Sequence, residues 1–443
     1  AEIEDLRVPI AGHQDVIGLE ISVNHALPVR VVDCLAQFDK QPAAVSQGRL
    51  DFGPPARERQ PLDQLRHQIG LAVDVAGVEL LKAEAIGTEG LPLAEFEIDG
   101  LADYSQIVFA GWDLFSEDLA AAAEEHDVLT YKQFRAVEEP LKAIKPWPAA
   151  GNDRFLSNID GGNRITVHNH RDTIAKLRAD LQGFRRTCSS VVVINLASTE
   201  KYVADGNEIF DSISSFETAL DDNSPDISPS MLYAYAAIVE RIPFGNFTPS
   251  VAADIPALIE FATASGVPIA GRDGKTGQTF IKSVIAPALR ARALKVDGWF
   301  STNILGNRDG LALSNEDSLA SKIMTKSSLL EDILGYEVED HLVDIRYYRP
   351  RRDNKEAWDN IDIRGFLGQN MQLKINFLCK DSILAAPLAI EIARCLDLAM
   401  QRGKGGIQDQ LAVFFKLPMA SDGHPEHAFH KQEDALIDWL KSE

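Results

Sequence analysis

The hydrophobic pattern becomes regular from residue 69 onward, where short hydrophobic runs alternate with stretches of helical spacing. Short hydrophobic runs at 69–73, 105–110 and 190–195 predict strands, and an amphipathic stretch at 173–186 predicts a long helix. Strands that are hydrophobic on both faces and alternate with helices are typical of a parallel sheet covered by helices on both sides. The pattern therefore predicts an α/β fold built on a doubly wound parallel sheet.

A break at Pro243–Pro249 separates this region from a second group of predicted elements. Strands are predicted at 267–270, 298–303 and 341–348, and helices at 255–265, 279–293 and 319–334. The final third of the chain adds a long hydrophobic helix at 383–400 and a closing helix. Residues 1–64 precede the α/β pattern and consist of short strand-like stretches separated by turn residues.

The charge of the chain excludes some classes of partner. The 443 residues carry 44 Lys and Arg against 66 Asp and Glu, a net charge of −22. Nucleic acids and anionic membrane surfaces favour basic proteins, so we expect neither as a partner. The sequence shows no signal-peptide pattern and no hydrophobic run near the ~18 residues of a spanning helix. We therefore expect a cytoplasmic protein.

The four cysteines and the histidines give no metal or disulfide pattern. Cys34, Cys188, Cys379 and Cys395 lie far apart in the sequence, which argues against a disulfide framework and a thiolate zinc site. The histidines at 168–170 and 424–430 are typical of surface or helix-capping positions. We expect no metal site, although the sequence leaves open whether a cation assists the protein.

A dinucleotide site would require glycines directly after the first predicted strand, where the backbone approaches the pyrophosphate. Only Asp74, Val75, Ala76 and Gly77 separate the strand at 69–73 from a helix that begins at Val78. One interpretation is that no dinucleotide binds here. The other is that a glycine-rich loop belongs between these elements and is missing from the chain as given. We favour the second interpretation because of the resemblance described below.

The segment Asp273–Ser283 is the richest in chemistry. It follows a predicted strand, contains glycines, hydroxyl groups and two lysines, and opens a predicted helix. Backbone N–H groups and lysines around a helix N-terminus are suited to binding an anion. The Gly274-Lys275-Thr276 triplet is not a Walker A motif, because Ile269 stands where that motif requires glycine.

Other candidate segments are less specific when each is taken alone. Asn195–Glu200 and Gly111–Asp113 follow predicted strands, and α/β sheets bind ligands at such strand ends. Asn303–Gly310 could be a simple Asn/Gly turn. Lys416 is flanked by Phe, Phe, Leu and Pro, so it should be partly buried, with its amine either reaching solvent or used chemically.

Taken together and in order, these segments resemble the myo-inositol-phosphate synthase family, most closely its shorter bacterial branch. The resemblance rests on Phe109–Asp113, Lys142–Pro148, Asn195–Glu200, Asn246–Ser250, Gly271–Ser283, Asn303–Gly310, Ser321–Asp332, Cys379–Ser382 and Phe414–Pro418. The chain departs from the family at Lys380, where an acidic residue is common, and at Phe280, where lysine is common.

The resemblance implies a Rossmann-like sheet with an inserted α+β domain for catalysis and oligomerisation. The implied divisions are a strand-rich appendage at 1–64, an NAD-binding domain at 65–245, the inserted domain at 246–355, and a return to the NAD-binding domain at 356–443. Residues 1–64 lie outside the resemblance. It also implies a homotetramer, formed mostly through the second domain.

The implied reaction is the NAD-dependent, redox-neutral cyclisation of glucose 6-phosphate to myo-inositol 3-phosphate, a step of inositol and phospholipid biosynthesis. Lys282 is expected nearest the reacting oxygen, and Lys326 and Lys416 are expected to stabilise charge. The implied catalytic residues are Lys275, Lys282, Lys326, Lys416, Asp309 and Asp340. The implied NAD-binding residues are Gly111, Asp113, Asn195, Ser198, Thr199 and Asp273. The implied substrate-binding residues are Thr248, Gly277, Gln278, Thr279 and Asn303.

Two alternative functions remain. A simple NAD-dependent sugar-phosphate dehydrogenase would share the fold but would accumulate NADH and would not need four lysines around one substrate. A protein that has truly lost the glycine-rich loop could instead be a sugar-phosphate-binding protein, and it would not bind NAD.

Overall fold

The computed structural model describes residues 98–103, 107–156, 159, 161–203, 206–307, 310–311 and 329–442. All of them belong to the second of two units into which the chain divides, Glu58–Glu443. Several sequence predictions fall outside the described residues. These are the appendage at 1–64, the strand and missing loop at 69–77, the residues Asp309 and Lys326, and most of the helix predicted at 319–334.

The first sheet is parallel, in the strand order β10, β5, β4, β3. Its strands are β3 (Val193–Asn195), β4 (Phe244–Asn246), β5 (Pro268–Gly271) and β10 (Gly406–Ile407). Side chains alternate across a strand, and Val193 and Ile269 join one hydrophobic core while Ile194 and Ala270 join another. The sheet is therefore covered on both faces, which confirms the predicted α/β fold.

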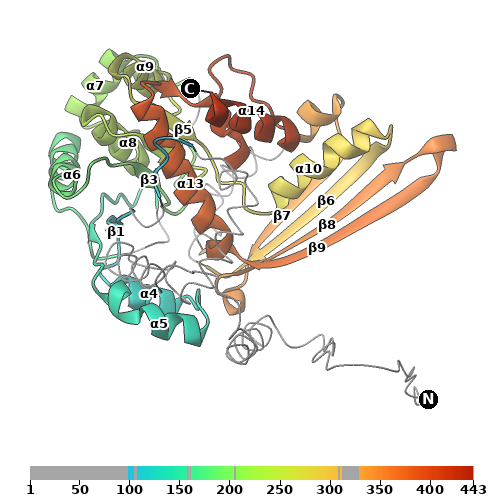
Figure 1. Cartoon of the computed structure of the whole chain (residues 1–443), viewed down its shortest axis with the longest axis horizontal. Helices are drawn as coiled ribbons and strands as arrows, with labels where there is room; N and C mark the ends of the chain where they lie inside the picture. The colour runs from blue at the N-terminus through green and yellow to red at the C-terminus, as the bar shows by residue number, and fades with distance from the viewer. Residues whose placement is uncertain are drawn as a thin grey trace, which may run out of the picture. The chain divides into compact units, whose positions relative to one another are not determined.

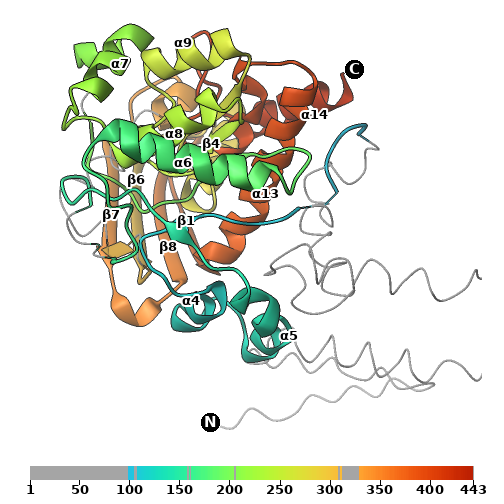
Figure 2. The same ribbon diagram turned by 90° about the vertical axis from the view of Figure 1, so that its left-hand side faces the viewer.

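Two groups of helices cover these faces. On one face pack α8 (Pro229–Val239) and α9 (Pro256–Ser265), with α6 (His170–Arg185) and α7 (Ile213–Asp221) outside them (Figure 2). On the other lies α13 (Asp381–Gln401), which contacts β3, β4 and β5. A Cβ atom at Gly245 of β4 would lie 2.7 Å from Ile194 Cδ1 and 3.1 Å from Ile392 Cγ2. Glycine thus allows α13 to pack closely on the sheet.

Local sequence explains where these helices begin and end. Ser228 caps α8 by accepting a hydrogen bond from the Met231 N–H, and Pro229 occupies the first helical position. Helix α8 is apolar around most of its circumference, which fits its burial inside the core. Helix α9 ends at Gly266, whose φ of 67° lies in the left-handed region that glycine favours.

The strand predicted at 105–110 is not formed in residues 107–110, the part of it that the structure describes. Residues 107–110 form no strand, and Val108 and Phe109 are exposed. The nearby strand is β1 (Trp112–Asp113), which pairs in parallel with β2 (Trp147–Pro148). A hydrophobic run forms a strand only where a neighbouring strand completes its hydrogen bonds, and β2 supplies that neighbour from Trp112 onward. Helices α4 (Leu119–Glu125) and α5 (Tyr131–Lys142) lie between β1 and β2.

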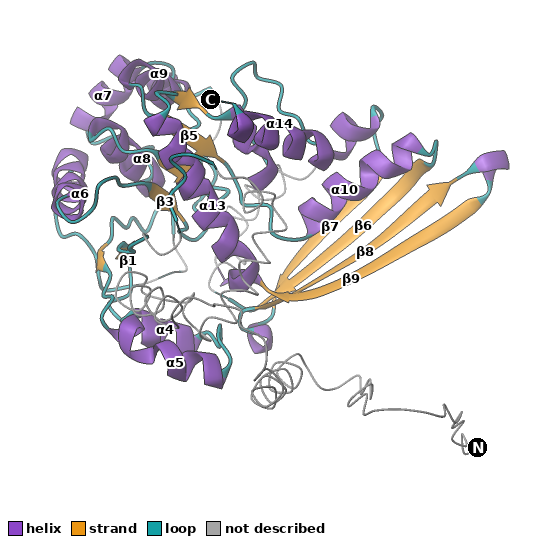
Figure 3. Cartoon of the chain, in the orientation of Figure 1, coloured by secondary structure: helices purple, strands orange, loops and turns teal. Residues whose placement is uncertain are grey.

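The second sheet has the strand order β7, β6, β8, β9 (Figures 1 and 3). Its strands are β6 (Lys295–Leu305), β7 (Asp340–Tyr347), β8 (Asn354–Arg364) and β9 (Asn370–Lys380). Strand β6 pairs in parallel with β7 and antiparallel with β8, and β8 pairs antiparallel with β9. One face packs on α10 (Gln278–Ala291) through a core that includes Trp299 and Ile361.

The chain closes with the 3₁₀ segment Asp409–Phe414, designated η6, and helix α14 (Phe429–Lys441), which pack on each other. The predicted domain boundaries stay a prediction. The strand order adds that β4 (Phe244–Asn246) and β5 (Pro268–Gly271) belong to the first sheet and that the second sheet continues to Lys380. Among the described helices, none combines the length and the hydrophobicity needed to cross a bilayer.

Candidate functional site

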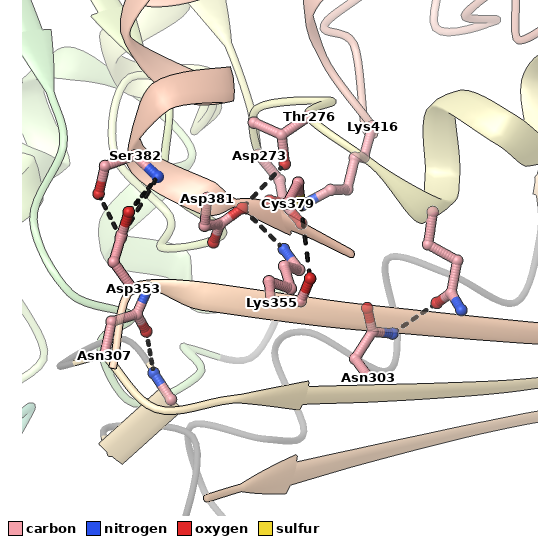
Figure 4. Close-up of polar contacts among 12 residues, drawn as sticks. Asp273, Thr276, Asn303, Asn307, Asp353, Lys355, Cys379, Asp381, Ser382 and Lys416 are labelled. Carbon is pink, nitrogen blue, oxygen red and sulfur yellow. Dashed lines mark hydrogen bonds and ion pairs between the residues drawn. The ribbon is translucent and has the colours of Figure 1, made fainter. Parts of the chain in front are cut away.

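A cleft lies between the start of α10 and the inner face of the second sheet. It is lined by Thr276, Gly277, Gln278, Thr279, Asn303, Leu305, Ile345, Lys355 and Lys416. The lining combines two lysines with hydroxyl and amide groups from α10 and β6 (Figure 4). The structure thus brings together five residues that the sequence analysis placed in the site, namely Gly277, Gln278, Thr279, Asn303 and Lys416.

The start of α10 is suited to binding an anion. Gly277 is the N-cap residue, and glycine has no side chain that could cap the helix. The N–H groups of the first turn of a helix have no partner inside the helix, and the helix dipole places partial positive charge there. A phosphate or carboxylate group could therefore bind at this helix terminus.

Lys416 reaches this cleft from the segment after η6. Its Nζ lies 2.5 Å from Oδ1 of Asp273, and both side chains are buried. Gly274 forms an isolated antiparallel bridge with Phe415, which holds the two segments together. Lys416 is therefore buried, as predicted. Of the two alternatives for its amine, the structure shows an amine paired with a carboxylate, not one that extends into solvent. Asp273, predicted to contact NAD, is this partner.

A buried polar network supports the amide groups of the cleft. Nδ2 of Asn303 donates to Oε1 of Gln278 at 2.5 Å, and Nε2 of Gln278 donates to Asp359 at 3.2 Å. Asp359 is fully buried and also accepts from Trp299 Nε1 at 2.8 Å and Ser301 Oγ at 2.6 Å. These contacts fix the orientation of Gln278 and Asn303 toward any bound molecule.

Lys282 lies one turn further along α10. Its Nζ is 2.7 Å from Nε2 of His341 on β7 and 5.6 Å from the Trp299 ring centroid. Burial lowers the pKa of this lysine to about 8, and the negative charge of Asp359 opposes the shift. An amine with such a pKa can exchange a proton near neutral pH.

Lys275 points away from the cleft lining, toward α14. Its Nζ donates to Oε1 of Gln432 and lies 5.8 Å from the Phe429 ring centroid. Burial lowers the pKa of Lys275 to about 7. Nearby His427 is also buried, 3.4 Å from an oxygen of Asp332. The expectation of a surface position is therefore wrong for His427, because α14 and its preceding loop pack over this lysine.

Asp340 begins β7 and is exposed, on the face opposite to that of its neighbour His341. Thr248 lies in the turn after β4, where its Oγ1 donates to Oδ1 of Asn246 at 3.2 Å and accepts from the Ser250 N–H. The structure does not bring Asp340 or Thr248 into the lining of the cleft.

The residues predicted to bind the cofactor lie near the carboxyl ends of strands in the first sheet and in or directly before β1. Asn195 is buried and donates to Ser230 Oγ and Asn246 Oδ1, at 3.1 and 3.2 Å. Thr199 is buried, Ser198 is half-buried, and both follow β3. Gly111 and Asp113 flank Trp112 in β1, and Asp113 is exposed. These strand ends are where open parallel sheets bind ligands.

Glu200 is the last residue of the candidate segment Asn195–Glu200, although no role was assigned to it. It is buried, and its Oε1 accepts from the Ser230 N–H at 3.1 Å. Its Oε2 has no hydrogen-bond partner within the described structure. Burial raises the pKa of its carboxyl group to about 7, despite opposing hydrogen bonds from Ser228 and Ser230.

Sequence reasoning also missed Lys355, Asp359 and Asp381. Strand β8 turns alternate side chains toward α10, so Lys355 and Asp359 share the inner face with the hydrophobic residues Ala357 and Ile361. The signal that the sequence offered for these residues was a charged side chain at an otherwise hydrophobic position of a strand. Asp381 belongs to a segment that supported the family resemblance, but no role was assigned to it.

Comparisons with a family model and with known proteins all point to the same family. Residues 91–441 match the family model described as myo-inositol-1-phosphate synthase, an NAD-binding family. Inositol-3-phosphate synthase 1 of Bacteroides thetaiotaomicron is 44% identical over 343 residues, covering 75% of this chain and 80% of that protein. Inositol-3-phosphate synthase of Saccharomyces cerevisiae is 29% identical over 378 residues, covering 76% of this chain and 70% of that protein.

Solved structures agree with this assignment. The crystal structure of inositol-3-phosphate synthase from Caenorhabditis elegans superposes with a TM-score of 0.73 at 26% identity, covering 76% of this chain and 71% of that one. A myo-inositol-1-phosphate synthase-related protein from Thermotoga maritima shares the fold with a TM-score of 0.67 at 22% identity, covering 86% of this chain and 96% of that one. The chain therefore belongs to the myo-inositol-1-phosphate synthase family.

Proposed function

We propose that the protein is an enzyme that cyclises glucose 6-phosphate to myo-inositol 3-phosphate, with NAD as its cofactor and no net redox change. Family membership supports the reaction. The structural observation that carries the proposal is the cleft in which Lys416 meets the uncapped N-terminus of α10. That combination can bind a phosphorylated sugar and stabilise an oxyanion on it.

The described residues at and after the carboxyl end of β3 fit NAD. Asn195, Ser198 and Thr199 provide amide and hydroxyl groups, and Glu200 provides a buried carboxylate oxygen without a partner in the described structure. Such groups suit the ribose hydroxyls and the carboxamide of the cofactor. When bound, NAD supplies reversible hydride transfer, so a redox-neutral cycle needs no second redox partner.

Within this proposal, the work is divided between residues of the cleft lining and Lys282, which lies outside that lining. The first turn of α10 and Thr279 bind the phosphate or hydroxyls, and Gln278 and Asn303 orient the sugar by hydrogen bonds. Nζ of Lys282 accepts and returns a proton, as its lowered pKa allows. Lys416 stabilises the developing enolate oxygen. Lys275, Lys326, Asp309 and Asp340 keep their sequence-based roles as predictions.

We also propose a cytoplasmic homotetramer that serves inositol and phospholipid biosynthesis. The outer face of the second sheet exposes a hydrophobic patch, formed by Phe300, Leu342, Trp358 and Leu378. The Phe300 and Trp358 rings pack edge to face, with centroids 5.8 Å apart. An exposed hydrophobic patch on a sheet is typical of a subunit interface.

The deciding experiment incubates the protein with glucose 6-phosphate and NAD while phosphorus NMR and NADH absorbance are followed. We expect an inositol phosphate to form with no lasting NADH signal. Accumulating NADH without inositol phosphate would favour the dehydrogenase alternative. Failure to bind NAD in calorimetric titration would favour the sugar-phosphate-binding protein. Repeating the assay with a chelator shows whether a divalent cation assists.

A further inference from the structure

Lys380 joins two parts of the structure that lie far apart in the sequence. Its Nζ donates hydrogen bonds to the main-chain oxygens of Asp127 and Val128, the latter at 3.0 Å. Lys380 is the N-cap residue of α13, and Asp127 and Val128 belong to the turn between α4 and α5. The chain departs from the family at this position, where an acidic residue is common. An ionised acidic side chain cannot donate these hydrogen bonds, so the contact belongs to this chain.

The end of α4 is suited to receive a cation from another part of the chain. Its last turn contains Glu124 and Glu125 and no basic residue. The C-terminal end of a helix carries partial negative charge and exposes carbonyl oxygens that have no partner inside the helix. Asp127 follows with a φ of 53°, in the left-handed region that often ends a helix. Lys380 thus supplies the positive charge and the N–H donors that α4 lacks in its own last turn.

Helices α4 and α5 form a hairpin, residues 119–142, with a hydrophobic core of its own. Its buried members are Ala120, Leu129, Val137 and Leu141. The three larger cores of the described structure include no residue of this α4–α5 hairpin. A segment with few hydrophobic contacts to its surroundings opens locally at low cost. Individual polar contacts such as those of Lys380 therefore affect how firmly the hairpin is held.

The contact links the two regions that the proposed reaction must bring together. Strand β1, just before the hairpin, contains Asp113, which is predicted to bind NAD. On the other side, Asp381 directly follows Lys380 and accepts from Oγ1 of Thr276, a residue of the cleft lining, at 3.3 Å. Hydride transfer depends on close placement of cofactor and sugar, and a misplacement of about 1 Å can cost roughly 10²-fold in rate.

We propose that Lys380 is a positioning residue, which fastens the α4–α5 hairpin to the start of α13 and so holds the end of β1 in place for NAD. This inference rests on the proposed function. Lys380 is half-buried and lies outside the cleft lining, so it acts on the cofactor through the hairpin. Losing its hydrogen bonds would let the hairpin open more often and would lower the affinity for NAD.

Amide hydrogen exchange of the full chain without ligands measures the fastening directly. Methionine at position 380 keeps most of the side-chain length but cannot donate a hydrogen bond. We expect Lys380→Met to speed exchange in α4 and α5 by about fivefold or more and to leave α6 unchanged. Lys132→Met, at an exposed position of α5 itself, removes the same charge and should change neither. Unchanged exchange in α4 and α5 of Lys380→Met would overturn the inference.

Calorimetric titration with NAD shows whether the fastening serves the cofactor. We expect Lys380→Met to weaken NAD binding by about threefold or more, with Lys132→Met as the unchanged control. Lys380→Arg should stay close to wild type, because its guanidinium can donate to the same oxygens. Lys380→Glu should weaken binding more than methionine does, since a carboxylate would face carbonyl oxygens and the acidic end of α4. A loosened hairpin with unchanged NAD affinity would make the contact purely structural and would overturn the positioning role.

Steady-state kinetics adds a reading that general destabilisation would not give. Lys380→Met should raise KM for NAD by about threefold or more and change KM for glucose 6-phosphate less than twofold. Equal increases in both constants would overturn the inference. Exchange and calorimetry need no turnover, so the two proposals can fail separately. If Lys380→Met loosens the hairpin and weakens NAD binding, but the wild-type protein forms no inositol phosphate, only the proposed reaction fails.

Discussion

The Nζ atom of Lys282 lies 2.7 Å from Nε2 of His341, and this contact joins α10 to β7. Two cations at this distance would repel each other, so at least one partner must be neutral when they are in contact. Burial lowers the pKa of Lys282 to about 8, which makes the neutral amine accessible. The geometry suits a lysine that takes up and returns a proton during each turnover.

Replacing Lys282 with alanine should abolish cyclisation while leaving the fold intact. The amine would be lost from the reaction, and general acid–base groups contribute roughly 10²–10⁴-fold in rate. Helix α10 keeps its contacts through Ala286 and Leu289, which belong to the core under the second sheet. The measurement is kcat together with the circular dichroism spectrum and the thermal midpoint. Near-normal turnover would contradict the role of Lys282.

Replacing His341 with leucine should shift the pH profile of kcat while leaving the fold intact. Leucine cannot accept a hydrogen bond from the ammonium form, so the pKa of Lys282 should fall further below its ordinary value. The limb of the kcat profile that reports Lys282 should then move to lower pH. His341→Gln keeps an acceptor and should restore most of the profile. A profile that is the same in all three proteins would show that the contact has no part in proton transfer.

Sequence and structure agree best where the pattern is local. Helix α10, strand β6 and the polar segment between β5 and α10 could be predicted because hydrophobic periodicity and glycine placement are encoded in consecutive residues. The pairing of Lys355 with Asp381 could not be predicted. The antiparallel pairing of β8 with β9 brings the two residues together. No local pattern in the sequence shows which strand lies beside which.

The side-chain directions of the lysines were equally beyond local reasoning. Lys275 and Thr276 are neighbours, yet one packs under α14 and the other lines the cleft. Their directions depend on where the last helix of the chain docks, more than 150 residues later. In the same way, the hydrophobic run at 105–110 predicted a strand, while strand formation depends on a partner that composition does not specify, and the described residues 107–110 form none.

Replacing Asp359 with asparagine should both destabilise the protein and change its pH profile. The carboxylate is fully buried and accepts from Trp299, Ser301 and Gln278, so an amide at one oxygen position would face a donor. We expect a loss of about 2–4 kcal/mol in the free energy of unfolding. Asp359 also raises the pKa of Lys282, so its loss should move the Lys282 limb of the profile to lower pH.

Urea denaturation and kcat profiles measure the two effects of Asp359→Asn separately. Ser301→Ala is the matched control, since it removes one donor to Asp359 without changing any charge or the Trp299 ring beside Lys282. This control should lower stability but leave the pH profile in place. A shift of the profile in the control would assign the effect to packing and contradict the electrostatic explanation.

Glutamine at position 200 should stabilise the protein above neutral pH. Burial raises the pKa of Glu200 from its ordinary value to about 7 in the folded protein. Between about pH 4.5 and 7 the folded state therefore binds more protons than the unfolded state, and stability falls as pH rises. Glu200→Gln removes this dependence. We expect the variant to gain up to roughly 3 kcal/mol over wild type between pH 5 and pH 8.

The measurement for Glu200→Gln is the free energy of unfolding in urea at pH 5 and pH 8. Glu124→Gln, on the exposed surface of α4, serves as the control and should show no such gain. A variant less stable than wild type at pH 8 would contradict the prediction.

Charges on the outer face of the second sheet should dissociate the proposed homotetramer. Trp358 and Leu378 lie on adjacent strands β8 and β9 and expose hydrophobic side chains on the same face as Phe300. Burying two glutamates against a neighbouring subunit would cost several kcal/mol per interface, because each carboxylate would lose its water.

Light scattering after gel filtration should show a tetramer of the 48.6 kDa chain for wild type and smaller species for Trp358→Glu/Leu378→Glu. Tyr131→Glu, at a more exposed aromatic position on α5, should remain tetrameric. A double variant that keeps the wild-type mass would place the subunit interface elsewhere.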